Sequence, residues 1–206
     1  DLKNSIDFKH HYVYLTNRGF NPKKMKEFRI GVSNEFKFKD RVIFPSFDKN
    51  YDLNYYISRS IDPDNKIRYR NFTGKRKDVI FRQSDLDFSK ALILTEGVFD
   101  LVNCPENSTC VLGSWIGDDH LLFKEIARNN TPVILCLDPD AIQKTLKIAK
   151  LFHSYCIDTK ISQHKNMDFG DMSKKDINYY LANAKQYDNA NLIGYLINDI
   201  RSGSIF

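Results

Sequence analysis

The sequence lacks the features of membrane, secreted and disulfide-stabilised proteins. None of its apolar runs approaches the roughly 18 residues of a transmembrane helix, and no signal-peptide pattern opens the chain. The cysteines are widely spaced and form no Cys-x-x-Cys pair, which argues against a zinc knuckle and a disulfide scaffold. Cys136 and Cys156 fall in or beside apolar runs and are expected to be reduced core residues. We therefore expect a cytoplasmic protein with no membrane partner.

An arrangement typical of nucleophilic catalysis is also absent. The sequence has no recognisable Ser/His/Asp or Cys/His pattern, and its histidines stand outside any motif. If the protein is an enzyme, a metal centre is the better candidate for its catalytic group.

The charges that are present are divided unevenly. Residues 1–90 carry 20 Lys and Arg against 12 Asp and Glu, a net +8, whereas residues 91–206 carry 11 against 14, a net −3. Excess positive charge suits a polyanion such as nucleic acid, and acid at strand ends suits a hard divalent cation. We predict a basic mixed α+β subdomain over 1–90, a second domain over 91–188, and a C-terminal helix and tail over 189–206.

Turn and helix signals organise the basic half. Helices are predicted over 8–18 and over Pro22–Phe28, where proline opens the helix. The β-rich runs 41–47 and 53–60 flank a stretch of turn composition and predict an antiparallel hairpin, with Pro45 at an edge or a bulge.

A basic run follows the hairpin. Its residues alternate, so an extended backbone places Lys66, Arg68 and Arg70 on one face and Ile67 and Tyr69 on the other. A solvated face without a partner is one interpretation, but the aromatic residues among the cations favour single-stranded nucleic acid. The predicted nucleic-acid-binding residues are Arg41, Arg59, Lys66, Arg68, Arg70, Lys75, Arg76 and Lys77.

From Ala91 onward the pattern changes to strands and helices in alternation. This order predicts an α/β fold with a mostly parallel sheet, right-handed crossovers and helices on both faces. The predicted strands lie near 91–95, 109–113, 132–138 and 155–161, and the predicted helices near 98–104, 118–130, 141–153, 173–186 and 190–200.

Acidic residues stand where three of these strands end. Because the carboxyl ends of parallel strands lie along one edge of the sheet, we expect the carboxylates to converge there, where one or two Mg²⁺ ions would neutralise their repulsion. The alternative is structural, since Asp118 and Asp140 are placed to cap the helices that follow them. The predicted catalytic acids or metal ligands are Glu96, Asp100, Asp138, Asp140, Asp168 and Asp171.

These acidic positions carry a family resemblance. Glu96-Gly97-x-x-Asp100 after one strand and Asp138-x-Asp140 after another resemble the Toprim domain shared by bacterial-type primases, type IA and II topoisomerases and some nucleases. The first half of the chain resembles the N-terminal subdomain of the primase catalytic core, so the resemblance covers nearly the whole chain. The segments that carry it are Tyr14-Leu15-x-x-Arg18-Gly19, Phe28-Arg29-Ile30-Gly31, Arg41-Val42-Ile43-Phe44-Pro45 and Tyr55-Tyr56-Ile57-Ser58-Arg59, with Tyr69-x-Asn71 after Arg68 resembling a template-binding ridge.

The resemblance implies template-directed synthesis of short RNA primers on single-stranded DNA from ribonucleoside triphosphates. Glu96 would act as general acid/base or metal ligand, Asp138 and Asp140 would hold Mg²⁺ or Mn²⁺, and Asp100 would support them. Asp168 matches the third acidic pair of the family, whereas Asp171 is offset by one residue. The expected nucleotide or phosphate contacts are Gly97 and, in a loop resembling the one after the next Toprim strand, Gly113 and Ser114.

Two modules usual in such primases would lie outside this chain, a zinc-binding module and the part that engages the replicative helicase. The chain is therefore expected to be an excised core or a compact phage or plasmid version acting in the bacterial cytoplasm. A Toprim nuclease and a non-catalytic DNA-binding or helicase-associated module are the alternatives.

Overall fold

The chain forms two compact units, Asp1–Ser84 and Asp85–Phe206. The computed structural model describes residues 8–113, 115–164, 167–188, 191–195 and 197. The division falls a few residues before residue 90, where the charge pattern placed the boundary. Within the described ranges, no helix has the length and apolar character needed to cross a membrane.

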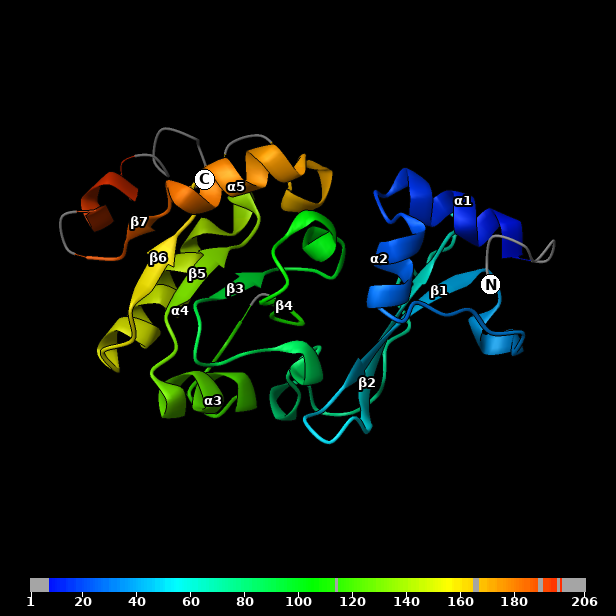
Figure 1. Ribbon diagram of the computed structural model, residues 1–206, viewed down its shortest axis with the longest axis horizontal. Coiled ribbons are helices and arrows are strands. Elements are labelled where there is room, and N and C mark those ends of the chain that lie inside the picture. The colour runs from blue at the N-terminus through cyan, green and yellow to red at the C-terminus, as the bar shows by residue number, and fades with distance from the viewer. Residues whose placement is uncertain (1–7, 114, 165–166, 189–190, 196, 198–206) are drawn as a thin grey trace. The chain divides into compact units, whose positions relative to one another are not determined.

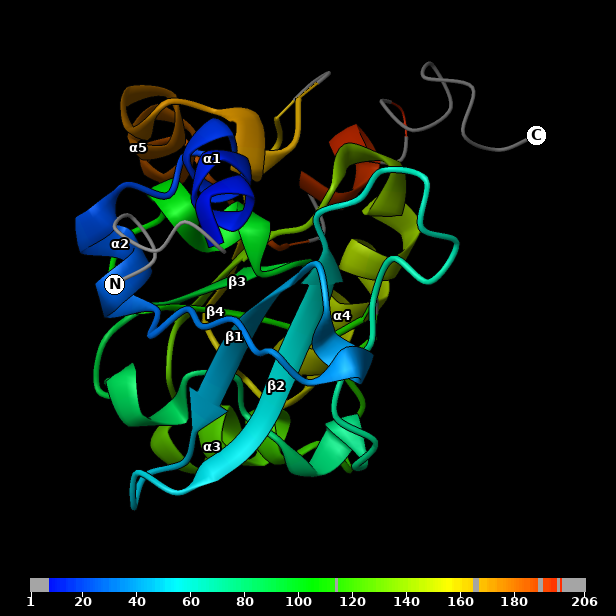
Figure 2. The same cartoon turned by 90° about the vertical axis from the view of Figure 1, so that its right-hand side faces the viewer.

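The first unit is built on a β-hairpin, which Figure 2 shows in front view. Strands β1 (Arg41–Phe47) and β2 (Leu53–Ser60) pair antiparallel as predicted, and their register shifts between Ser46 and Phe47. The predicted helices are also present, as α1 (Lys9–Asn17) and α2 (Pro22–Glu27). Short 3-10 helices, η2 (Phe36–Phe38), η3 (Arg76–Asp78) and η4 (Gln83–Asp85), complete the connections.

Aromatic side chains form much of the core of this unit. The ring of Phe20 lies 5.5 Å from the rings of both Phe28 and Phe44, measured between centroids. All three side chains are buried, together with Leu15 from α1 and Tyr55 from β2. Ring contacts of this kind, edge-to-face between Phe20 and Phe28 and tilted between Phe20 and Phe44, add to the stabilisation from apolar burial. They hold the helices against one face of the hairpin.

The second unit is a mostly parallel five-stranded sheet flanked by helices, which confirms the predicted fold class. Its strand order is β4-β3-β5-β6-β7, with only β7 antiparallel to its neighbour. The strands are β3 (Leu92–Thr95), β4 (Ser108–Cys110), β5 (Val133–Cys136), β6 (Thr159–Ile161) and β7 (Lys185–Gln186).

Helices cover both faces of this sheet, as the βαβ order requires (Figure 1). One face is covered by α3 (Leu121–Asn129) and α4 (Ile142–Ser154), which follow β4 and β5. On the other face, Ile93 and Cys136 pack against the 3-10 helices and α5 (Lys174–Ala182). These 3-10 helices are η5 (Phe99–Asn103) and η7 (Phe169–Asp171), and a further one, η6 (Pro139–Ala141), leads into α4.

Several predictions for this half were wrong in detail. The helix expected over 173–186 ends at Ala182, because Lys185–Gln186 pairs instead with the edge of β6. Cys156 is exposed beyond the end of α4, with a φ of 59°, so it is not a core residue, whereas Cys136 is buried. Of the helix predicted over 190–200, residues 191–195 and 197 are helical and the others lie outside the described residues.

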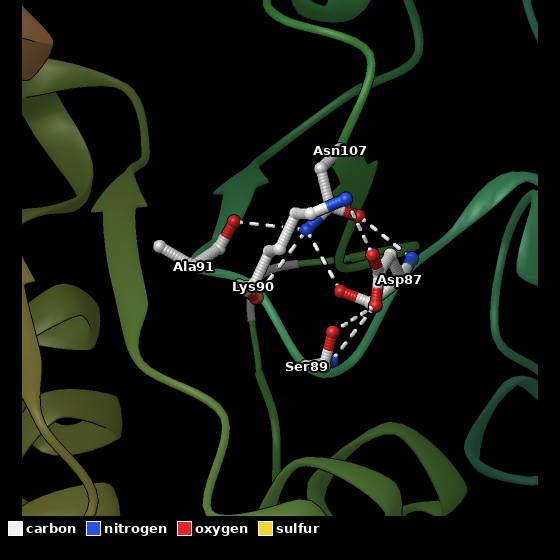
Figure 3. Close-up of polar contacts among 5 residues, drawn as sticks. All are labelled: Asp87, Ser89, Lys90, Ala91 and Asn107. Carbon is white, nitrogen blue, oxygen red and sulfur yellow. Dashed lines mark hydrogen bonds and ion pairs between the residues drawn. The ribbon is translucent and has the colours of Figure 1, made fainter.

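The loop that enters β3 is fixed by one amide side chain (Figure 3). Asn107 donates from Nδ2 to the carbonyl oxygens of Ala91 at 2.9 Å and Asp87 at 3.0 Å, and its Oδ1 accepts from the N–H of Asp87 at 2.9 Å. Hydrogen bonds from Lys90 and Ser89 in turn lower the pKa of Asp87 to about 2. These contacts within the second unit fix the residue at which β3 starts. They thereby also help to fix where the strand ends.

Candidate functional site

The carboxyl end of β3 places the first acidic residue of the site. Glu96 follows the buried residue Thr95, whose hydroxyl donates to the carbonyl oxygen of Gly97 at 3.1 Å. The N–H of Gly97 donates to Oδ2 of Asp100 at 2.7 Å, which closes a tight turn after the strand. Glu96 is half-buried in this turn, and its buried Oε2 has no hydrogen-bond partner among the described residues.

A second segment packs directly against this turn. A Cβ atom on Gly170 would lie 3.1 Å from the carbonyl oxygen of Phe99 and 3.2 Å from Oδ1 of Asp100, closer than side chains normally approach. Glycine at this position therefore allows η7 to contact η5. This packing carries Asp168, the residue before η7, to the end of β3.

The acidic residues act on one another at this edge of the sheet. Burial, and to a lesser extent the negative charges of Asp100, Asp168, Glu96 and Asp140, together raise the pKa of Asp138 to about 7. Burial also raises the pKa of Asp100 to about 6, although the N–H of Gly97 favours its charged form. Carboxylates from the ends of β3 and β5 and from the loop after β6 thus lie close enough to repel each other.

The predicted members of this cluster have different places. Asp100 is buried, Glu96 and Asp138 are half-buried, and Asp140 and Asp168 are exposed. Asp171 is exposed at the end of η7, and its charge is not among those that raise the pKa of Asp138 or Asp100. We name Glu96, Asp100, Asp138, Asp140 and Asp168 the carboxylate cluster.

The carboxylate cluster fits a hard divalent cation by its chemistry. All of its ligand atoms are oxygens, and its charges repel one another. Within the part of the chain that the structure describes, one buried oxygen of Glu96 also has no hydrogen-bond partner. In the described part of the chain, however, no three His, Cys, Asp or Glu side chains are already placed as a ligand set. A cation would therefore draw the carboxylates together as it binds.

The loop after β4 lies at the same edge, because β4 runs parallel to β3. Gly113 has a φ of 142°, which supports a turn that residues with a Cβ rarely make. Ser114 lies outside the described residues. Sequence reasoning passed over the next residue, Trp115, which is 49% exposed. Trp115 is the only tryptophan of the chain, and this is the one feature of the sequence that could have predicted a role for it.

The basic residues of the first unit lie beside the outer edge of β2. The segment that holds them pairs with this strand through backbone hydrogen bonds, from Ser60 N–H to Arg68 at 2.9 Å and from Arg70 N–H to Ser58 at 2.9 Å. It forms only an isolated bridge, between Arg59 and Tyr69, and not the regular strand that alternation suggested. Its exposed cations are Lys66, Arg68 and Arg70, and those around η3 are Lys75, Arg76 and Lys77.

Arg41 does not belong to this exposed surface. Its side chain is 3% exposed, and its guanidinium donates to the carbonyl oxygens of Ile67 at 2.6 Å, Arg68 at 3.4 Å and Ser58 at 3.5 Å. The prediction that Arg41 contacts nucleic acid is therefore corrected, because its donors hold the basic segment against β2. Arg59 is half-buried, with its guanidinium 4.6 Å from the ring centroid of Tyr69.

Comparison with known proteins identifies the fold. The sequence matches no protein-family model and no curated protein sequence. Its structure is similar to a DnaG catalytic core, with a TM-score of 0.74 and 17% identity over 97% of this chain and 79% of that one. A DnaG primase catalytic domain bound to single-stranded DNA gives a TM-score of 0.73 and 15% identity over 96% and 77%.

A third similar structure is that of the zinc-binding and RNA polymerase domains of the Aquifex aeolicus primase. It gives a TM-score of 0.74 and 17% identity over 98% of this chain and 61% of that one. At such low identity the similarity shows the architecture of the chain. The protein has the fold of the catalytic core of DnaG primases.

Proposed function

We propose that this chain is the catalytic core of a DNA primase, which makes short RNA primers on single-stranded DNA by metal-dependent nucleotidyl transfer. The observation that carries the proposal is the carboxylate cluster, gathered at the carboxyl edge of a sheet that has the architecture of primase cores. In this interpretation the second unit is a Toprim domain, and the substrates are ribonucleoside triphosphates.

The residues that would hold the divalent cation are Glu96, Asp138, Asp140 and Asp168. A bound Mg²⁺ or Mn²⁺ would neutralise the nucleotide's phosphates and polarise the phosphoryl group under attack. Glu96, which is half-buried at the end of β3, would accept the proton of the primer's 3′-hydroxyl through its carboxylate. The 3′-oxygen then forms its bond to the α-phosphorus, and pyrophosphate leaves with the electrons of the broken bond.

Asp100 acts as a positioning residue. It accepts the N–H of Gly97 at 2.7 Å, so it fixes the turn on which Glu96 stands. Burial raises the pKa of Asp100, which means that its negative charge is unfavourable at this edge of the sheet. A bound cation would stabilise that charge.

The first unit supplies the surface for the template. Lys66, Arg68 and Arg70 are exposed beside the aromatic side chains of Tyr69 and Phe72, which are themselves about half exposed. Cations that contact phosphates, next to rings on which bases can stack, are the usual components of a surface for single strands. This is the kind of ligand named for one of the similar structures, which was determined with single-stranded DNA.

The test is primer synthesis on a mixed-sequence single-stranded template with four ribonucleotides, comparing Mg²⁺ with Mn²⁺. Glu96→Gln and Asp138→Asn should each reduce synthesis at least about a hundredfold while leaving the fold intact. Glu106→Gln is the matched control, because Glu106 is an exposed acid before β4, at the opposite edge of the sheet. It should retain wild-type synthesis.

Three results would contradict the proposal. Synthesis that persists in EDTA would exclude the metal, and cleavage of labelled DNA with Mg²⁺ and no nucleotides would indicate a Toprim nuclease. Absence of incorporation with either metal, together with wild-type DNA binding by the Asp138→Asn variant, would indicate a non-catalytic DNA-binding or helicase-associated module.

A further inference from the structure

The indole of Trp115 is exposed in the loop after β4. Its side chain is 49% exposed, whereas the next residue, Ile116, is fully buried. Ile116 therefore anchors the loop after β4, and Trp115 presents a large aromatic surface outside the core. Tryptophan is usually well buried in folded proteins, so an indole held half in solvent next to a candidate active site points to a ligand.

The register of the sheet places the loop that carries this indole at the same edge as the carboxylate cluster. β4 pairs with β3 in parallel, and the N–H of Val111 donates to the carbonyl oxygen of Thr95 at 3.0 Å, directly before Glu96. Trp115 is four positions after Val111 in the sequence, so their Cα atoms lie at most roughly 14 Å apart. A nucleotide with its phosphates at the carboxylates could place its base in this region.

The loop also holds the indole in a defined position. A Cβ atom on Gly117 would lie 3.2 Å from the indole Nε1 and 3.4 Å from Nδ1 of His120, so glycine lets both side chains approach the backbone. The N–H of Gly117 donates to Nδ1 of His120 at 3.0 Å. The indole of Trp115 is thus supported along one edge by the backbone of Gly117, and the buried Ile116 anchors the loop. Binding a ligand would therefore cost little conformational entropy of the indole.

We propose that Trp115 is a stacking residue that binds a nucleobase at the carboxyl edge of the second unit. The base could come from an incoming nucleoside triphosphate or from a single strand. The nucleotide is favoured, because the neighbouring carboxylate cluster suits a cation that carries triphosphate. This inference rests on the proposed function and adds a residue that the carboxylates do not include.

The chain's single tryptophan provides a direct test. Trp115 fluorescence is measured while the full chain is titrated with ATP or UTP and Mg²⁺, with N-acetyltryptophanamide correcting for absorption by the nucleotide. Saturable quenching, together with protection from acrylamide, is expected. A response to oligothymidylate but not to either nucleotide would support the stacking role and identify the single strand as the source of the base.

Variants separate stacking from a general effect on the fold. Trp115→Ala should weaken binding of radiolabelled UTP about five- to tenfold in equilibrium dialysis, the lower part of the range for one stacked base, and Trp115→Phe should restore most of it. Tyr155→Ala is the control, because Tyr155 is an exposed aromatic residue beyond the end of α4, at the amino edge of the sheet. It should keep both the affinity and the fluorescence response.

The inference would be overturned if neither nucleotide nor oligothymidylate changed the fluorescence, or if Trp115→Ala bound UTP as tightly as wild type. These binding measurements require no turnover. A chain that makes primers without a Trp115 response therefore refutes only this inference, and a chain that shows the response without synthesis refutes only the proposed polymerase.

Discussion

Arg41 and Ile67 are joined by a hydrogen bond of 2.6 Å from the buried guanidinium to the backbone carbonyl. The same side chain reaches the carbonyl oxygens of Arg68 and Ser58, so one arginine ties the basic segment to β2. A buried cation therefore helps to position the exposed cations of the segment, together with the backbone hydrogen bonds between the segment and β2. Two roles for positive charge, positioning and phosphate contact, can therefore be separated by mutation.

Arg41→Lys should lower the free energy of unfolding by about 2–3 kcal/mol, because an ammonium cannot reproduce the fork and leaves buried carbonyls without donors. Urea denaturation followed by circular dichroism measures the change. Lys66→Ala is the control, since Lys66 is exposed and its loss should change stability by less than about 0.5 kcal/mol. Wild-type stability of Arg41→Lys, with weakened DNA binding, would restore Arg41 to the contact surface.

Substitution of the exposed cations should weaken DNA binding and leave the free energy of unfolding nearly unchanged. Lys66→Ala, Arg68→Ala and Arg70→Ala should each weaken single-strand binding similarly for all sequences and reduce the slope of log affinity against log salt by about 0.7, because each contact releases counterions. Fluorescence anisotropy at several salt concentrations gives the slope. Lys150→Ala, an exposed lysine on α4, should leave it unchanged. Unaltered slopes in the first three variants would mean that the segment is a solvated face.

Most of the architecture could be predicted from local pattern. The hairpin follows from two β-rich runs around a turn, and the parallel sheet from short apolar runs that alternate with helices. The carboxylates that end β3 and β5 could be placed together because parallel strands share one carboxyl edge. The register of β3 against β5 pairs Thr95 with Cys136, so Glu96 lies one residue and Asp138 two residues beyond this pair, at the same edge of the sheet.

The features that escaped prediction depend on tertiary contacts. The sequence around Arg41 does not indicate that its side chain is buried. The carbonyl oxygen of Ile67, which accepts its hydrogen bond, lies 26 residues further along the sequence. The pairing of Lys185–Gln186 depends on the free edge of β6, which overrides the helical pattern of residues 173–186. Asp171 was grouped with Asp168 by sequence proximity, but η7 leaves its charge outside the carboxylate cluster.

Asn107 should prove important for the stability of the second unit. Asn107→Ala removes the hydrogen bonds to Asp87 and Ala91 and should lower the free energy of unfolding by about 1–2 kcal/mol, since the amide is only half-buried. Denaturation followed by Trp115 fluorescence reports on this unit. Asn103→Ala, which removes a single hydrogen bond to the carbonyl of Met172, should cost less. Equal losses would show that Asn107 does not fix the loop before β3.

The carboxylate cluster predicts a fall in stability as the pH rises without metal. Asp100 and Asp138 have pKa values of about 6 and about 7 in the folded chain, above the value near 3.9 expected when it is unfolded. Between about pH 4 and pH 7 the folded state therefore holds protons that the unfolded state has lost. Stability must then decrease with pH over this window, by an amount on the order of 2–3 kcal/mol from Asp100 alone.

Urea denaturation in EDTA between pH 4 and 8, followed by Trp115 fluorescence, measures this fall. Asp138→Asn should flatten it, because the variant loses one titrating group and one charge that acts on Asp100. Asp64→Asn, an exposed acid of the first unit, should retain the wild-type slope. Mg²⁺ at pH 7.5 should stabilise the wild type more than Asp138→Asn, since the cation binds the folded cluster only. A wild-type stability that rises from pH 4 to pH 7, or equal Mg²⁺ effects in both proteins, would mean that the carboxylates do not form one electrostatic site.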